Sequence, residues 1–278
     1  MSQPLHITVG LDDEPASLLA VDWAIREATR RPCRITLLSV FYLRLTDQIN
    51  EEELLAQQRE RVLQAAPGTT VETALAEGTI PETLKRHTAE TDLLVIGAQR
   101  HHWWHSLMSG NIPTSVAVAS SCPIVVVPGD WQPRDGDTVV GIDDDHSSDE
   151  ALRVAADFAG RANRHLRVVH AWSLPTVPVH PLGLYDYEPS DETREAHRRW
   201  LDAAVERVAG DAPDLEVEGD LHNADAASVL LEAGASAELV VVGTHRRGLI
   251  TAVMLGSVAR YLLHHSKTPV CVVPPREA

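Results

Sequence analysis

The sequence predicts an α/β protein made of two tandem units, each an open, doubly wound parallel sheet. Short apolar runs alternate with segments of helical character along the 278 residues, a pattern typical of parallel strands joined by right-handed crossovers. One strand–loop–helix segment occurs twice, because Gly97 and Gly243 stand 146 residues apart, as do Pro123 and Pro269. A chain of this length fits two domains, each large enough to bury a core.

In the first repeat, strands are expected at apolar, β-branched runs and helices between them. The expected strands are 7–11, 35–41, 71–76, 92–96 and 124–127. The expected helices run from Pro15 onward and over 51–65, 81–88 and 112–120. Pro15 suits a first helical turn, where its missing N–H is not needed.

The second repeat follows a linker at 129–137 and keeps the same order. Its expected strands are 139–142, 166–171, 215–221, 239–242 and 270–273, and its clearest helices are 192–208, 224–234 and 258–265. Asp12 and Asp143 end the first strands and stand 131 residues apart, so the second repeat carries an insertion of 15 residues. Four prolines at 173–190 predict that this insertion is a loop.

The second glycine segment has the features of a phosphate cradle. The buried strand 239–242 ends at Gly243, a loop follows, and Gly256-Ser257 opens a helix. Ser is a favoured N-cap residue, and the N–H groups at the start of a helix bind anions. The alternative is a plain connection between a strand and a helix, since many such units look alike.

These residues carry a resemblance to the universal stress protein family, whose signature is Gly, two residues, Gly, nine residues, Gly, then Ser or Thr. In the second repeat Gly243, Gly256 and Ser257 match this signature, and Arg246 replaces its middle glycine. In the first repeat Arg100 replaces the middle glycine and Asn111 takes the Ser/Thr place. The chain thus resembles a tandem universal stress protein over residues 7–127 and 139–273.

The resemblance implies a Rossmann-like strand order of 3-2-1-4-5 and an ATP site at the crevice between strands 1 and 4, where ligands of such sheets bind. Mg²⁺ would accompany the nucleotide. In the second repeat the implied ligand-binding residues are Asp143, Ala171, Gly243, His245, Arg246, Gly256 and Ser257. In the first repeat they are Asp12, Val40, Gly97, Gly110 and Asn111.

We expect the second crevice to bind better than the first. Arg246 would be strained if its φ were positive, and would clamp a phosphate if its φ were ordinary. In the first repeat Trp103 and Trp104 could fill the phosphate end, and Pro113 removes a helical N–H. The alternative is a structural, protein-interaction module whose crevices have degenerated and hold no nucleotide.

Composition excludes several functions. A net charge of −16 argues against a nucleic-acid partner. The sequence contains no run of 18 apolar residues, so we expect no membrane span. The three cysteines show no spacing typical of disulfide pairs, so we expect them to be buried, unpaired residues of a protein in the reducing cytoplasm. No metal-ligand or nucleophile–base pattern is found, so we expect no enzyme and at most slow, incidental ATP hydrolysis.

The expected domain boundaries are 1–130 and 137–278. The order 3-2-1-4-5 makes the last strand of each repeat an edge, and an open apolar edge invites pairing. The resemblance implies that these two strands pair within the chain, with a homodimer as a further possibility. The protein partner of such a sensor or adaptor is not indicated by the sequence.

Overall fold

The computed structural model describes residues 4–41, 45–99, 120–144, 148–173, 190–244 and 255–275, with the side chains of 45–48, Pro81 and Thr88 left out. Residues 112–119 of the predicted helix 112–120 and nearly all of the predicted loop at 173–190 lie outside these ranges.

The first half contains every strand expected from the sequence. Its elements are β1 (Leu5–Leu11), α1 (Pro15–Arg30), β2 (Cys33–Phe41), α2 (Leu45–Ala65), β3 (Thr70–Glu77), α3 (Ile80–Thr88), β4 (Leu93–Ala98) and β5 (Ile124–Pro128). Pro15 is the first residue of α1, as predicted.

The second half repeats this order. Its elements are β6 (Thr138–Ile142), α5 (Asp149–Ala162), β7 (Leu166–Trp172), α6 (Asp191–Asp211), β8 (Val217–Asn223), α7 (Ala226–Gly234), β9 (Leu239–Gly243), α8 (Ser257–His265) and β10 (Val270–Val273). The prediction that Ser257 caps α8 is wrong. Gly256 is the N-cap and Ser257 the first helical residue, so the Ser257 hydroxyl does not serve the helix as its cap.

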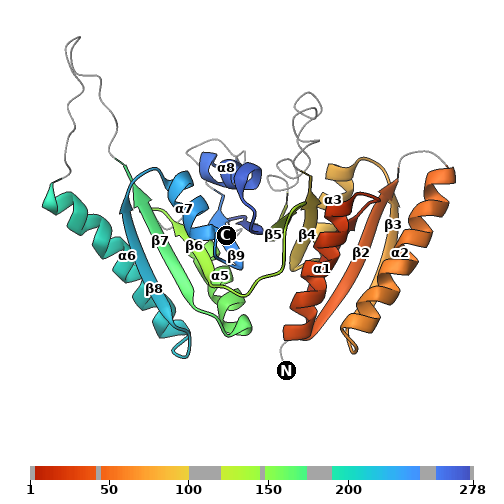
Figure 1. Cartoon of the computed structure of the whole chain (residues 1–278), viewed down its shortest axis with the longest axis horizontal. Coiled ribbons are helices and arrows are strands. Elements are labelled where there is room, and N and C mark those ends of the chain that lie inside the picture. Colours follow the sequence, from red (N-terminus) through yellow and green to blue (C-terminus); the bar gives the residue numbers. More distant parts are fainter. Residues whose placement is uncertain are drawn as a thin grey trace, which may run out of the picture.

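The two halves form one ten-stranded sheet, in the order β3-β2-β1-β4-β5-β10-β9-β6-β7-β8 (Figure 1). Each half has the predicted order 3-2-1-4-5, and the described strand pairs within each half are parallel. Strands β5 and β10 meet in antiparallel orientation, with Val126 opposite Val270 and Ile124 opposite Val272. The predicted pairing of the two last strands is therefore confirmed.

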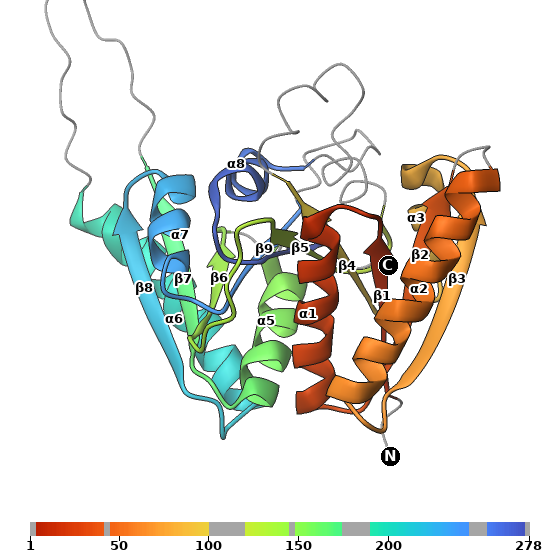
Figure 2. The ribbon, with the colours of Figure 1, turned by 45° about the vertical axis from the view of Figure 1, so that its right-hand side comes forward.

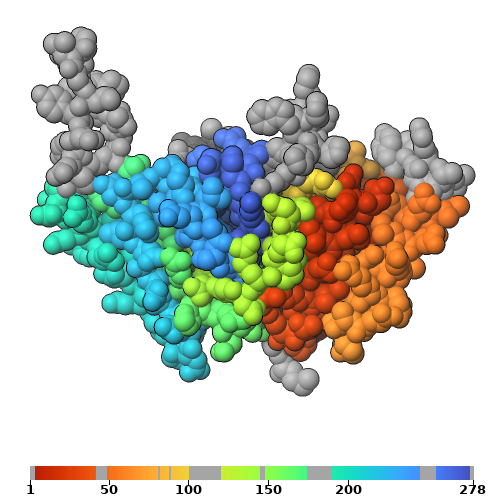
Figure 3. All heavy atoms as spheres, in the orientation of Figure 1, coloured from red at the N-terminus to blue at the C-terminus, as the bar shows by residue number. Residues whose placement is uncertain are grey.

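Helices cover both faces of this sheet. On one face α1, α2, α5 and α6 bury the larger core (Figure 2). In this core Trp23 of α1 meets Phe158 of α5 edge-on, with ring centroids 6.0 Å apart. On the other face α3, α7 and α8 cover a second core. Trp172 and the three unpaired cysteines are buried, as the apolar sequence around them predicts. The two halves meet along a central seam in the space-filling view (Figure 3).

Candidate functional site

Three predicted site residues of the first half come together at the carboxyl ends of its strands. Leu11 pairs with Ser39, so the next residues along these strands, Asp12 and Val40, are neighbours. Val9 pairs with Val95, and continuing this register by two residues puts Gly97 beside Leu11, next to Asp12. The geometry is the one expected for a crevice between strands 1 and 4.

The second half brings together the equivalent residues. Ile142 pairs with His170, which makes Asp143 and Ala171 neighbours. Gly141 pairs with Val242, so Gly243 lies beside Ile142. The two crevices therefore share one backbone frame, although their side chains differ.

A serine five residues after each aspartate holds the loop that carries it. The Asp12 backbone N–H donates to Ser17 Oγ at 3.3 Å, and the Asp143 N–H donates to Ser148 Oγ at 3.1 Å. Sequence reasoning missed these serines, although the repeated spacing from Asp to Ser could have revealed them. The serines fix where each carboxylate stands at the rim of its crevice.

Desolvation by the surrounding protein raises the pKa of the Asp12 carboxyl above its ordinary value, although the residue keeps an exposed surface. Hydrogen bonds from Ser17 and from the backbone N–H of Glu14 partly offset this rise.

Gly97 and Gly256 are glycines for different reasons. A Cβ on Gly97 would stand 2.2 Å from the carbonyl carbon of Ala16, so glycine is required for β4 to pack against the start of α1. A Cβ on Gly256 would meet no atom of the described residues within 4 Å, and the φ of −61° is ordinary for any residue. Neither packing nor backbone geometry explains Gly256.

The start of α8 presents N–H groups that the helix itself does not use. The first bond of the helix runs from Arg260 N–H to Gly256 O at 3.0 Å. The N–H groups of Ser257, Val258 and Ala259 precede it and have no intrahelical acceptor. With the partial positive charge of the helix dipole, this terminus can accept an anion.

An aromatic cluster that sequence reasoning missed lies beside Ala171. His170, which is 1% exposed, has its Nε2 2.8 Å from His197 Nδ1, and the His197 ring stacks on Trp172 with centroids 4.3 Å apart. His170 Nδ1 donates to the Ile142 carbonyl at 3.1 Å, so His170 Nε2 accepts from His197 Nδ1–H when both rings are neutral.

Burial, followed by the proximity of His170, lowers the pKa of His197, while Asp144 and Asp143 act in the opposite direction. The cluster thus ties β7 to α6 next to the second crevice.

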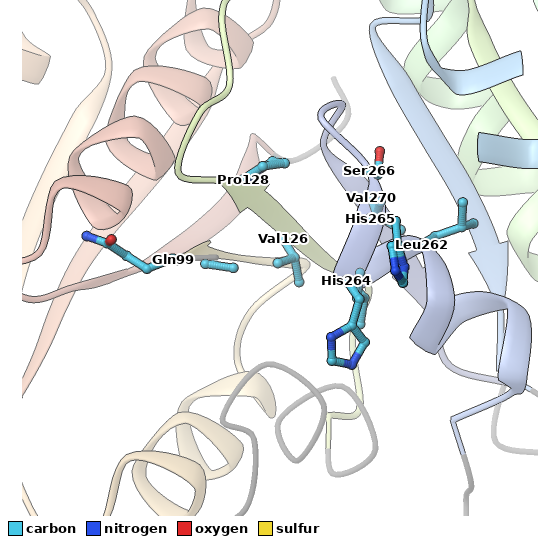
Figure 4. Close-up of a pocket in the computed structure, with 10 residues that line it drawn as sticks. Gln99, Val126, Pro128, Leu262, His264, His265, Ser266 and Val270 are labelled. Atoms are coloured by element: carbon cyan, nitrogen blue, oxygen red, sulfur yellow. The ribbon is translucent and has the colours of Figure 1, made fainter. Parts of the chain in front are cut away.

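A cavity of about 180 Å³ lies at the junction of the two halves, on the face covered by α8. Val126 and Val270, which are paired across β5 and β10, line it with Gln99 and with His264 near the end of α8 (Figure 4). None of the predicted nucleotide-binding residues that the structure describes lines this cavity.

Four predicted site residues lie outside the described ranges: Gly110, Asn111, His245 and Arg246. Within those ranges no group of three His, Cys, Asp or Glu side chains could hold a metal ion. Among the described helices, none combines the length and the apolar character needed to cross a membrane.

Comparison with known proteins identifies the family. The model of the universal stress protein family matches residues 5–128 and 137–274. A universal stress protein of Mycolicibacterium smegmatis is 32% identical over 293 aligned positions, covering 97% of each chain. The crystal structure of a universal stress protein from Archaeoglobus fulgidus has a TM-score of 0.71 at 16% identity and covers 97% of this chain and 96% of its own.

A single-domain universal stress protein solved in complex with cAMP covers 46% of this chain, with a TM-score of 0.40 and 22% identity. The two matches of the family model span nearly the whole chain and coincide with the two five-stranded halves of the sheet. The chain belongs to the universal stress protein family and carries two copies of its domain.

Proposed function

We propose that this chain is a cytoplasmic, ATP-binding stress-response protein that acts as a sensor or adaptor, with the second crevice as its better site. The domains that carry the two crevices would span 1–130 and 137–278. The observation that carries the proposal is Gly256. Gly256 has an ordinary φ, and no described residue would contact a Cβ there, so a glycine at this place suits a helix start that a phosphate must approach.

Each residue of the second crevice then has a role. Asp143 and Ala171, neighbours at the strand ends, would line the adenosine end. Gly243, Gly256 and Ser257 would hold ribose and phosphates, and Ser257 suits this role because its hydroxyl is not the cap of α8. His245 and Arg246 would add positive charge, with Mg²⁺ accompanying the nucleotide. Favourable interaction of one phosphate charge with the helix dipole is worth about 0.3–1 kcal/mol.

The first crevice would bind ATP more weakly, through Asp12, Val40, Gly97, Gly110 and Asn111. Its helix start carries Asn111 and Pro113 where the second repeat has Ser257 and Ala259. A proline there removes one of the N–H donors. Bound nucleotide would be read by a protein partner, and hydrolysis, if measurable, would be slow and incidental.

Isothermal titration of the full chain with ATP tests this proposal. Gly256→Asp puts a carboxylate where the phosphates would lie, so affinity should fall at least tenfold. Gly160→Asp is the matched control, because Gly160 also has open space around it and is exposed on α5. Equal ATP affinity in wild type and Gly256→Asp would refute the assigned crevice.

A second candidate is a protein-interaction module without bound nucleotide. In its favour, the cavity that the described residues enclose beside Asp143 measures only about 10 Å³, with Trp200 and Ser148 in its wall. Absence of any heat of ATP binding to the wild-type chain would favour this candidate, and release of phosphate at an enzymatic rate would contradict both.

A further inference from the structure

The seam between the two halves has two corners that the internal repeat makes equivalent. At each corner the helix after the first strand of one half meets the amino ends of the strands of the other half. We call the corner between α1 and the second half the closed corner, and the corner between α5 and the first half the open corner.

Ion pairs fill the closed corner. Arg26 of α1 bonds to the Asp135 carboxylate at 2.5 Å and to the Arg134 carbonyl at 2.9 Å. Glu238 pairs with Arg30 and, at 3.4 Å, with Arg26. Carboxylates of the linker and of the second half thus neutralise arginines of the first half.

The open corner lacks these carboxylates and forms a cleft of about 350 Å³. Pro4 precedes β1 at the place where Asp135 precedes β6, so no carboxylate stands there. Asp92 occupies the place of Glu238, but its carboxylate accepts the His6 backbone N–H at 2.9 Å. Among the described contacts, Asp92 forms no counterpart of the pair between Arg30 and Glu238.

Three arginines line this cleft: Arg31, Arg153 and Arg161. The Arg31 side chain is 5% exposed, lies over the Phe158 ring at 5.4 Å, and bonds to Asp157 at 2.9 Å. Its Nε is buried without a hydrogen-bond partner among the described residues. Arg161 also uses its Nε on Asp157, at 2.7 Å. Each guanidinium has five N–H donors, so these bonds leave donors to spare.

The remaining N–H donors and the shape of the cleft define its ligand. Its lining carries three arginines together with Asp92 and Asp157. Glu27 also pairs with Arg31, and Glu150 pairs with Arg153, so an anion would bind through the guanidinium donors that these ion pairs leave over. Leu5, Leu93 and Phe158 supply apolar wall, and a volume of about 350 Å³ is at the small end of ligand pockets. A guanidinium recognises carboxylate and phosphate groups with two parallel hydrogen bonds.

We propose that the open corner binds a small organic anion, with its carboxylate or phosphate on Arg153 and Arg161 and its apolar body on Phe158. Both halves contribute to the cleft, so the bound anion would contact both of them. It would thereby stabilise the packing of the two halves against each other.

Titration of the full chain with four probes tests this inference: inorganic phosphate, succinate, phenyl phosphate and benzoate. Phenyl phosphate or benzoate should bind with a Kd below about 1 mM, since each combines an acid with an apolar ring. The stronger of the two identifies the preferred acid group, and the probes without a ring should bind more weakly.

Arg153→Gln and Arg161→Gln should each weaken this binding at least fivefold. Both side chains are substantially exposed, so neither change endangers folding. Arg61→Gln, which removes an arginine paired with Asp22 outside the cleft, should leave binding unchanged. Gly256→Asp should also leave binding of these probes unchanged, because it alters the nucleotide crevice and not this cleft. Failure of all four probes to bind at 10 mM, or equal affinity in both cleft variants and wild type, would overturn the inference.

Discussion

The two halves tie their second strand to their second helix at the same positions but with different chemistry. In the first half, Ser39 of β2 donates to the Glu51 carboxylate of α2 at 2.5 Å. In the second half, His170 occupies the place of Ser39, and its partner on α6 is His197, at 2.8 Å. Trp172, which takes the place of Phe41, stacks on His197.

The comparison shows which features the shared frame requires. The bond from an aspartate N–H to a serine hydroxyl is kept in both halves, because it shapes the loop at the strand end. The contact between strand and helix can change from a hydroxyl–carboxylate bond to an imidazole pair, since either fills the space and satisfies its polar atoms. The two crevices therefore differ in chemistry but not in architecture.

The largest effect is expected at the pairing of β5 and β10, to which each half contributes its last strand. Val272 is 1% exposed, so Val272→Lys would bury a charge with no partner among the described residues and separate the edges. We expect a loss of about 4 kcal/mol in the free energy of unfolding and lower solubility. Urea unfolding and light scattering measure both quantities, and a variant as stable as wild type would show that the junction is dispensable.

Gly97→Ala and Gly256→Ala should separate a glycine needed for packing from one that is not. The Cβ on residue 97 would overlap the Ala16 backbone, so a loss of about 3 kcal/mol is expected. The Cβ on residue 256 meets nothing, and stability should stay within about 0.5 kcal/mol. Thermal unfolding of the two variants and the wild type measures these changes in stability. Similar losses in both variants would remove the argument that Gly256 serves a ligand.

Glu238→Gln should show how much the closed corner contributes to joining the halves. Glu238 is 9% exposed and pairs with Arg26 and Arg30, so its neutralisation should lower the free energy of unfolding by about 2 kcal/mol. Glu150→Gln, which breaks the more exposed pair with Arg153, should lower it by at most about 0.5 kcal/mol. Equal losses would contradict the difference between the corners.

The smallest effect concerns pH and distinguishes the two strand–helix contacts. Because the folded state lowers the pKa of His197 below its ordinary value of 6.5, the unfolded chain takes up this proton first as the pH falls. The stability that depends on neutral His197 is complete above pH 6.5 and is lost as the pH falls from 6.5 toward the folded pKa.

His197→Gln should therefore flatten the pH dependence of the melting temperature in this window. Glu51→Gln, at the equivalent position of the first half, removes no imidazole and should leave that dependence as in wild type. An unchanged slope in His197→Gln would show that the protonation of His197 does not affect stability in this window.

Patterns local in sequence predicted the strands, and the resemblance to the universal stress protein family predicted their order and the pairing of β5 with β10. Apolar runs mark strands whatever their neighbours do, and the duplicated Gly97 and Gly243 place two of them at once. The His170–His197 contact was not predicted, because it joins residues 27 positions apart whose meeting depends on the exact register of α6 on β7. The N-cap of α8 was misplaced by one residue, since Gly and Ser are both common at that position.

A crystal structure of the full chain with ATP tests the central claim, that the two crevices share a frame but differ in binding. We predict nucleotide density in the second crevice, with phosphates at the α8 N-terminus beside Gly256 and the adenosine between Asp143 and Ala171. Density at Asp12 and Gly97 should be weaker or missing. Nucleotide in the first crevice alone, or none in either at saturating ATP, would contradict the account.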